Sequence, residues 1–329
     1  MAFSTIGSSG EAAVQGSVAE ALRGRRRSDT RGRLFEAGLL ASLLICLLVL
    51  GVLIMTVLLD GMPVYSERGW EFLDSGISSI ADRAGISQGI VGSFWIAVCV
   101  LVLAVPFGIG AAIYLEEYAR RNKLTSFIEL NIRNLAGVPS VVYGLLGLAI
   151  FVEALNGFSG SSGVEARTLA AAGVTLAVLV LPIVIITTQE AIRAVPQALR
   201  EGAYGVGATR WEVIRSQVLP YAAPGIFTGT LLSIARAIGE AAPLIVVGAV
   251  TGFFSGAEGL NIQNVTDPSH LQERFVALPT IVTTWAKLPE DEFKIANASA
   301  TIIAMLVFVL LINSIAIVLR NRYEKKRSS

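Results

Sequence analysis

The chain has 329 residues, of which 53% are hydrophobic and only 16% are charged, and its mean hydropathy is +0.66. Soluble globular chains carry about 25% charged residues, so this composition excludes an ordinary soluble domain. The net charge of +1 favours neither nucleic acid nor an acidic partner. Charges are missing from long blocks, which is the pattern of a chain that crosses a membrane several times.

Six apolar blocks predict membrane-spanning helices, because each approaches the ~20 residues that cross ~30 Å of hydrocarbon. They are Ala37–Leu59, Gln88–Leu115, Asn134–Val152, Thr168–Gln189, Tyr221–Val250 and Ile295–Leu319. Only the block Tyr221–Val250 contains charged residues, Arg236 and Glu240. No alternating strand-length segments are visible, which favours helices over a barrel. The sequence therefore predicts an all-α membrane protein with six spans.

Lys and Arg gather in the N-terminal tail, in the loops after the second and fourth spans, and in the C-terminal tail. By the positive-inside rule, both termini are expected in the cytosol. A basic tail could also be an arm that binds nucleic acid, but next to a membrane span the topological interpretation is preferred. The expected divisions are a flexible basic tail (1–33), a first span (34–60), an external amphipathic segment anchored by Trp70 (61–86), a five-helix module (87–319) with an external loop at 251–294, and a basic cytosolic tail (320–329).

Several kinds of chemistry have no counterpart in the sequence. There is no G-x-x-x-x-G-K-[ST] motif for ATP, and His270 is the only histidine. Cys46 and Cys99 both fall in predicted spans and form no C-x-x-C pair. The expectation is a chain with no catalytic site, no metal and no cofactor of its own.

The segment 194–220, between the fourth and fifth spans, predicts two short helical pieces around a glycine turn. Pro196 begins the first piece, Gly205 and Gly207 interrupt it, and Thr209 can cap the second. Such a helix–turn–helix would project as a knob. Its apolar contact is expected from Trp211 and Ile214, and its polar rim from Arg200, Glu201 and Arg210. The alternative is a loop that merely joins two spans, which its length disfavours.

This segment resembles the E-A-A loop of ABC importer permeases, whose pattern is E-A-A-x-x-x-G followed after nine residues by I-x-L-P. The matching residues are Glu201, Ala203, Gly207, Leu219 and Pro220, whereas Gly202 replaces the second alanine and Gln217 the isoleucine. The resemblance implies that these residues, with Gly202, Arg210 and Trp211, form a coupling helix that seats in a separate ATPase subunit. That subunit would bind the ATP and Mg.

Three further segments resemble the phosphate-specific permeases of type I ABC importers, and Ile113–Ala119 favours their PstA branch. These segments are Asn134–Gly144, Ala235–Leu244 and Leu319–Lys325. The resemblance implies a multi-pass protein of the bacterial inner membrane. It implies four partners: a PstC-like second permease, a dimeric PstB-like ATPase, an external PstS-like phosphate-binding protein, and phosphate itself.

Arg236 is a candidate for the substrate pathway, because an arginine inside a span is expensive and functional by default. Its guanidinium fork suits a tetrahedral oxyanion. Glu240 lies four residues further on and can neutralise Arg236 when no anion is present. The alternative is a static ion pair that fixes helix packing.

The third span holds a second candidate set. Pro139 is expected to loosen the helix, with Ser140 and Tyr143 as hydrogen-bond donors and Arg133 near the cytosolic side. The alternative is close packing through Gly137, Gly144 and Gly147. The sequence thus predicts a phosphate importer permease. The alternatives are a permease for sulfate or molybdate, or a secondary transporter with Glu240 as proton carrier.

Overall fold

The computed structural model describes residues 30–154, 167–249, 260 and 262–328. The chain forms two compact units, one up to Thr56 and one from Val57 onward. In the described parts the secondary structure is helical apart from one isolated bridge, between Thr168 and Arg274. This confirms the all-α prediction.

The first unit is occupied by the first part of α2 (Thr30–Arg68). Its side chains from Leu34 to Met55 are almost all apolar and exposed, as expected for a helix surrounded by lipid. The helix begins inside the segment predicted as tail, and residues 1–29 lie outside the described part.

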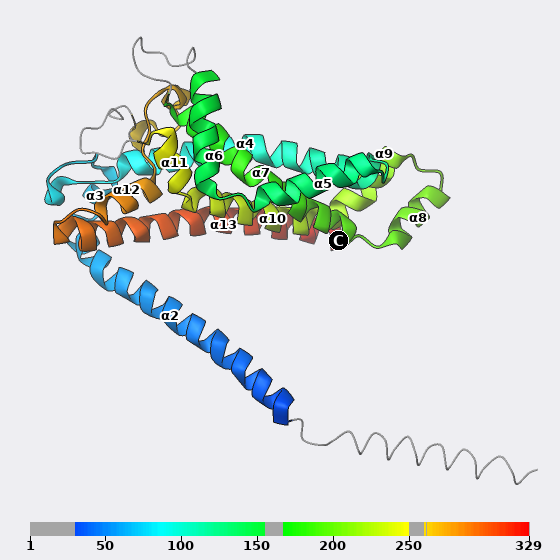
Figure 1. The fold of residues 1–329 in the computed structure, drawn as a ribbon, viewed down its shortest axis with the longest axis horizontal. Coiled ribbons are helices and arrows are strands. Elements are labelled where there is room, and N and C mark those ends of the chain that lie inside the picture. Colours follow the sequence, from blue (N-terminus) through cyan, green and yellow to red (C-terminus); the bar gives the residue numbers. More distant parts are fainter. Residues whose placement is uncertain (1–29, 155–166, 250–259, 261, 329) are drawn as a thin grey trace, which may run out of the picture. The chain divides into compact units, whose positions relative to one another are not determined.

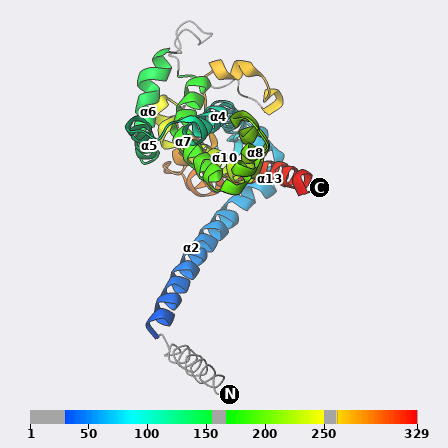
Figure 2. The same cartoon turned by 90° about the vertical axis from the view of Figure 1, so that its right-hand side faces the viewer.

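The second unit is a helical bundle. Four long helices run along it, and α6 is turned across them (Figures 1 and 2). The long helices are α4 (Ser87–Ile113), α7 (Leu169–Arg193), α10 (Leu219–Gly239) and α13 (Ala298–Ser328). The shorter elements are α3 (Trp70–Asp74), η1 (Ala81–Arg83), η2 (Tyr114–Tyr118), α5 (Lys123–Ala136), α6 (Ser140–Leu146), η3 (Gly147–Val152), α8 (Gln197–Gly205), α9 (Arg210–Val213), η5 (Ile214–Val218), α11 (Ala242–Val247), η6 (Ile262–Asn264), η7 (Pro268–Gln272), α12 (Leu278–Trp285) and η8 (Glu292–Asn297).

Glycines let the long helices approach closely. A Cβ added to Gly108 of α4 would lie 2.9 Å from the Cβ of Val184 in α7, and one added to Gly225 of α10 would lie 2.8 Å from that of Ala191. One added to Gly229 would overlap the side chain of Thr187. Small residues at such positions are what allow helices to pack without a hydrophobic driving force in lipid.

Five helices in the described chain are long and apolar enough to cross a membrane, or six if the bent pair of α5 with α6 and η3 counts as one span. The third span predicted at Asn134–Val152 is broken where Pro139 was expected to loosen it: α5, which begins already at Lys123, and the helix after it are bent by 104° relative to each other. The cause is Pro139, which lacks an amide hydrogen and disfavours helical geometry in the residue before it.

The predicted fifth span, Tyr221–Val250, is also interrupted. α10 ends at Gly239, Glu240 is extended (φ −84°, ψ 111°), and the chain resumes as α11. Position 250 lies outside the described residues. A helix that stops inside an apolar block is unusual, because its freed backbone groups need new partners.

The two interrupted helices pack against each other. A Cβ on Gly144 of α6 would lie 2.7 Å from Cα of Pro243 in α11, and a Cβ on Gly147 would lie 2.9 Å from Val247. Close packing through these glycines is therefore observed. Gly137 does not take part, since only its own helix lies nearby.

At the end of this unit that lies opposite α8, the elements α3, α12 and η8 are held together by aromatic packing and by hydrogen bonds to backbone carbonyls. The ring of Phe72 lies 6.4 Å from that of Trp285, which lies 5.6 Å from that of Phe293. Arg68 and Asn297 both donate to the carbonyl of Ala81. The buried Trp285 shows that the described part of the 251–294 loop is ordered, whereas Trp70 is 69% exposed.

We expect Gly144→Ala to destabilise this unit by about 1–3 kcal/mol, because the added methyl group meets the backbone of Pro243. Thermal unfolding in detergent measures the effect. Gly110→Ala is the matched control, since nothing lies within 4 Å of its added Cβ. Equal melting temperatures for the two variants would contradict the packing described here.

Candidate functional site

The segment between α7 and α10 begins as predicted. Pro196 precedes α8, and Gly207 has φ +86°, a left-handed conformation that favours glycine. Thr209 then caps α9 in a reciprocal box with Glu212. The second piece is not separate, however: α9 continues through the π-helical η5 into α10, so the knob and the fifth span are one continuous helix.

Apolar side chains are exposed around this turn. Val206 is 85% exposed, Trp211 53% and Tyr204 46%. The predicted contact residue Ile214 is fully buried, so that assignment is wrong, because η5 turns it towards the core. Val206 was not predicted, although an apolar residue between two turn glycines is a visible signal.

The predicted coupling residues divide by exposure. Glu201, Gly202, Gly207, Arg210 and Trp211 are exposed, whereas Ala203, Leu219 and Pro220 are half-buried. Arg200 was expected on the polar rim but points inward, where its Nη2 lies 3.0 Å from Oε1 of Glu117. Glu117 itself was not predicted as a site residue.

Arg236 and Glu240 form the predicted pair, with Nε of Arg236 3.3 Å from Oε1 of Glu240. Within the predicted span Tyr221–Val250, Arg236 occupies the last turn of α10. Its side chain is 49% exposed and that of Glu240 is 19% exposed. The pair therefore sits at the break between α10 and α11, with a guanidinium accessible from outside the chain.

The candidates around Pro139 have mixed outcomes. The hydroxyl of Tyr143 is buried and donates to the carbonyl of Leu135 at 2.9 Å. In an unbroken helix that carbonyl would accept from residue 139, which as a proline has no amide hydrogen. Tyr143 thus stabilises the break, and its expected role in the substrate pathway stays a prediction.

Ser140 is half-buried at the start of α6, and Arg133 is exposed on α5. No hydrogen bond or ion pair links Ser140, Tyr143 or Arg133 with Arg236 in the described residues. The two sets of candidates are related through the packing of α6 on α11 and not through a shared polar cluster.

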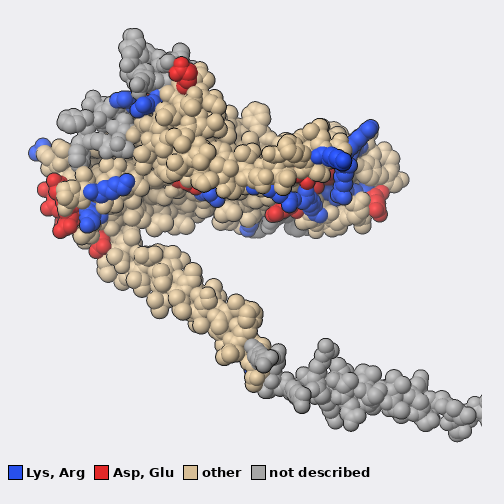
Figure 3. Space-filling view, in the orientation of Figure 1, with Lys and Arg blue, Asp and Glu red and all other residues tan. Residues whose placement is uncertain are grey.

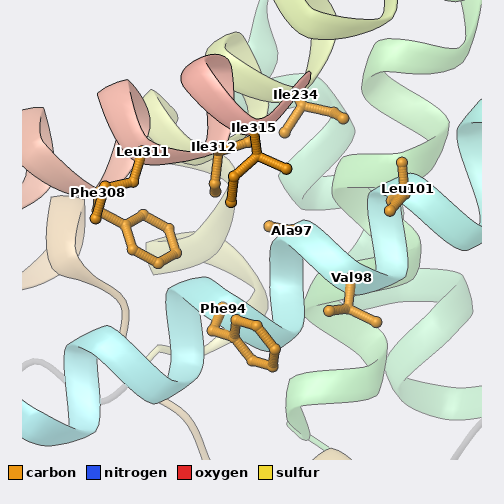
Figure 4. Close-up of a pocket in the computed structure, with 9 residues that line it drawn as sticks. All are labelled: Phe94, Ala97, Val98, Leu101, Ile234, Phe308, Leu311, Ile312 and Ile315. Atoms are coloured by element: carbon orange, nitrogen blue, oxygen red, sulfur yellow. The ribbon is translucent and has the colours of Figure 1, made fainter. Parts of the chain in front are cut away.

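A groove of about 310 Å³ lies between α4 and α13 (Figure 4). All nine residues that line it are apolar: Phe94, Ala97, Val98, Leu101, Ile234, Phe308, Leu311, Ile312 and Ile315. Such a surface offers no donor to an anion, so it suits lipid tails or another apolar helix. Within the described chain, no group of three metal-ligating side chains occurs.

Comparison with known proteins shows which family has this sequence and this arrangement of helices. The family described as "Binding-protein-dependent transport system inner membrane component" matches residues 104–329. In the solved bacterial alginate ABC transporter, bound to an alginate-loaded periplasmic protein, one chain superposes with a TM-score of 0.56 and 18% identity. The match covers 87% of this chain and 94% of that one, and it supports the type I importer permease fold.

Two relatives cover most of the chain. The "Probable ABC transporter permease protein YqgI" of Bacillus subtilis is 30% identical over 83% of this chain and 89% of its own length. The "Phosphate transport system permease protein PstA" of Yersinia pestis is 34% identical over 74% of each chain. The resemblance inferred from the sequence is confirmed: the chain belongs to the family of binding-protein-dependent transport system inner membrane components.

Proposed function

We propose that the chain is the permease subunit of an ATP-driven phosphate importer. Two relatives named as phosphate transport permeases, from Yersinia pestis and Pasteurella multocida, support the substrate class. The observation that carries the proposal is the accessible Arg236–Glu240 pair at the break between α10 and α11.

The pair suits a tetrahedral anion passing through. A half-exposed guanidinium presents several donors in one plane, and it stays charged at all physiological pH values. Glu240 neutralises Arg236 at rest, and a phosphate oxygen takes its place during passage. Because Glu240 repels a dianion, its carboxylate then turns away from the anion.

The exposed turn between α8 and α9 is the proposed seat of the ATPase, which holds the ATP and Mg. Lys and Arg side chains are visible at both ends of the unit (Figure 3); the cytosolic position of this end is supported by the basic loops after the second and fourth spans. A PstC-like permease would complete the path, and a PstS-like protein would deliver phosphate to the opposite face. This chain then performs no covalent step of its own.

Reconstituted uptake tests the proposal. Vesicles containing the permease pair and the ATPase are loaded with ATP, the phosphate-binding protein is added outside, and entry of radiolabelled phosphate is measured with sulfate, molybdate or arsenate as competitors. We expect ATP-dependent uptake that arsenate inhibits and sulfate does not. Inhibition by sulfate or molybdate would reassign the substrate, and uptake that persists without the ATPase would contradict an ATP-driven importer.

Replacement of Arg236 tests its role directly. We expect Arg236→Gln to reduce uptake by about 100-fold or more, since the charged guanidinium that would hold the anion is lost from the proposed pathway. Arg236→Lys keeps the charge without the fork and should restore only part of the rate. Arg121→Gln, on an exposed loop, is the control. Unchanged uptake by Arg236→Gln, with equal protein level, would eliminate the pathway role.

Substitution of Gly207 tests whether the turn between α8 and α9 binds the ATPase. A side chain at φ +86° is strained by roughly 1–2 kcal/mol, so Gly207→Ala should distort the turn and weaken co-purification of the ATPase. Amide hydrogen exchange in α8 should rise in the same variant. Gly205→Ala, which has an ordinary φ and open space around it, should leave exchange in α8 unchanged or slower. Identical behaviour of both variants would argue against a defined turn.

A further inference from the structure

Three consecutive side chains of η2, at the end of α4, each contact a different arginine between the end of α7 and the start of α9. Glu116 pairs with Arg193 at the end of α7. Glu117 pairs with Arg200 of α8, and the ring of Tyr118 lies 5.1 Å from the guanidinium carbon of Arg210 at the start of α9. Because successive residues of a helix point in different directions, the three arginines contact different sides of η2. We call these three contacts the η2 clasp.

The central contact of the clasp is the most buried. The side chain of Glu117 is 10% exposed and that of Arg200 is 17% exposed, with N and O 3.0 Å apart. The same Nη2 of Arg200 donates to the carbonyl of Ile192 at 2.9 Å, in the last turn of α7. Arg200 thus joins three elements, because its one nitrogen touches both the end of α4 and the end of α7.

Little else attaches α8 to the unit. Of its nine residues only Arg200 and Ala203 are not exposed, and none is buried. They lie three positions apart and therefore face the same side. Ala203 packs against the small apolar cluster of Ile192, Val213 and Val218. Besides the chain connections at its two ends, α8 is therefore oriented by the methyl group of Ala203, by the Arg200–Glu117 ion pair and by the hydrogen bonds at the Ile192 and Ala203 carbonyls.

The outer contacts of the clasp are weaker. The side chain of Arg193 is 44% exposed and has a second carboxylate, that of Glu129, at 4.0 Å. Arg210 and Tyr118 both lie at the surface. Solvent screens such pairs, whereas breaking a buried pair leaves an uncompensated charge. The position of α8 therefore depends mainly on Glu117 and Arg200.

We infer that the Glu117–Arg200 ion pair holds α8 and the end of α4 together, so that a displacement of α8 moves α4 as well as α10. Covalent continuity already connects the turn to α10 through α9 and η5. The ion pair adds a second connection, to a helix that packs along α7. Glu117 and Arg200 are positioning residues here, because neither touches substrate. The inference rests on the proposed function, in which binding of the ATPase displaces α8.

Loss of the pair should uncouple hydrolysis from transport. In the complete reconstituted complex, we expect Glu117→Gln to lower phosphate uptake by roughly tenfold or more, with unchanged permease level and with ATP hydrolysis retained. The ratio of phosphate moved to ATP hydrolysed then falls. Glu129→Gln, which removes a more exposed carboxylate near Arg193, should leave that ratio within about twofold of wild type.

Exchanging the charges of Glu117 and Arg200 distinguishes a positioning role of the ion pair from a general loss of stability. We expect Glu117→Arg combined with Arg200→Glu to recover a substantial part of the uptake that each single variant loses, because the pair is re-formed in reverse. Equal loss in the swap and in the single variants would overturn the inference, as would an unchanged uptake-to-hydrolysis ratio in Glu117→Gln.

A distance measurement decides the inference without transport. Spin labels at Tyr114→Cys and Val206→Cys, both exposed positions, report the separation of η2 from the end of α8 in a chain with Cys46 and Cys99 replaced by alanine. We expect a narrow distance distribution that widens with Glu117→Gln and narrows again in the swap. An unchanged width overturns the inference. If the wild-type complex instead moves no phosphate while the widths change as expected, the proposed function fails and the mechanical link stands.

Discussion

Within apolar surroundings, every backbone amide and carbonyl needs a partner, and this constraint decides where the helices of this chain can be interrupted. The break before Pro139 is tolerated because the carbonyl of Leu135 accepts from the amide of Val138 and the hydroxyl of Tyr143. The break at Glu240 lies next to α11, which packs on α6 through Gly144. The two irregular stretches thus support each other, and the one charged pair of the apolar blocks sits beside them.

The second constraint acts at the other end of the same helices. α10 begins as a continuation of α9, so it leads from the exposed turn at Gly207 to Arg236 without an interruption other than the π-helical η5. π-helical turns are often found at functional positions, because they insert a residue without ending the helix. A displacement at the turn therefore reaches the arginine along one element, and the η2 clasp extends it to α4.

Much of this was predictable from the sequence, and the failures have physical causes. Composition predicted the spans, and Thr209 predicted the start of α9. Pro139 predicted a loosened third span but not its sharp bend, and the fifth span was expected to be continuous, because apolar content alone does not show where a helix ends. Ile214 was assigned to the surface from its spacing in the sequence. The assignment failed because η5 changes the helical register there, and residue spacing does not reveal such a change. Glu117 was missed because its partner, Arg200, lies 83 positions away, although two adjacent carboxylates ending an apolar block need cations.

The central claim is that the break between α10 and α11 borders the path of the anion. Its most direct test is the rate at which a charged, membrane-impermeant thiol reagent modifies Ala241→Cys in the assembled complex, in a chain without Cys46 and Cys99. The account predicts that the position reacts and that phosphate slows the reaction whereas sulfate does not. A position that never reacts, or that reacts equally fast with and without phosphate, would contradict it.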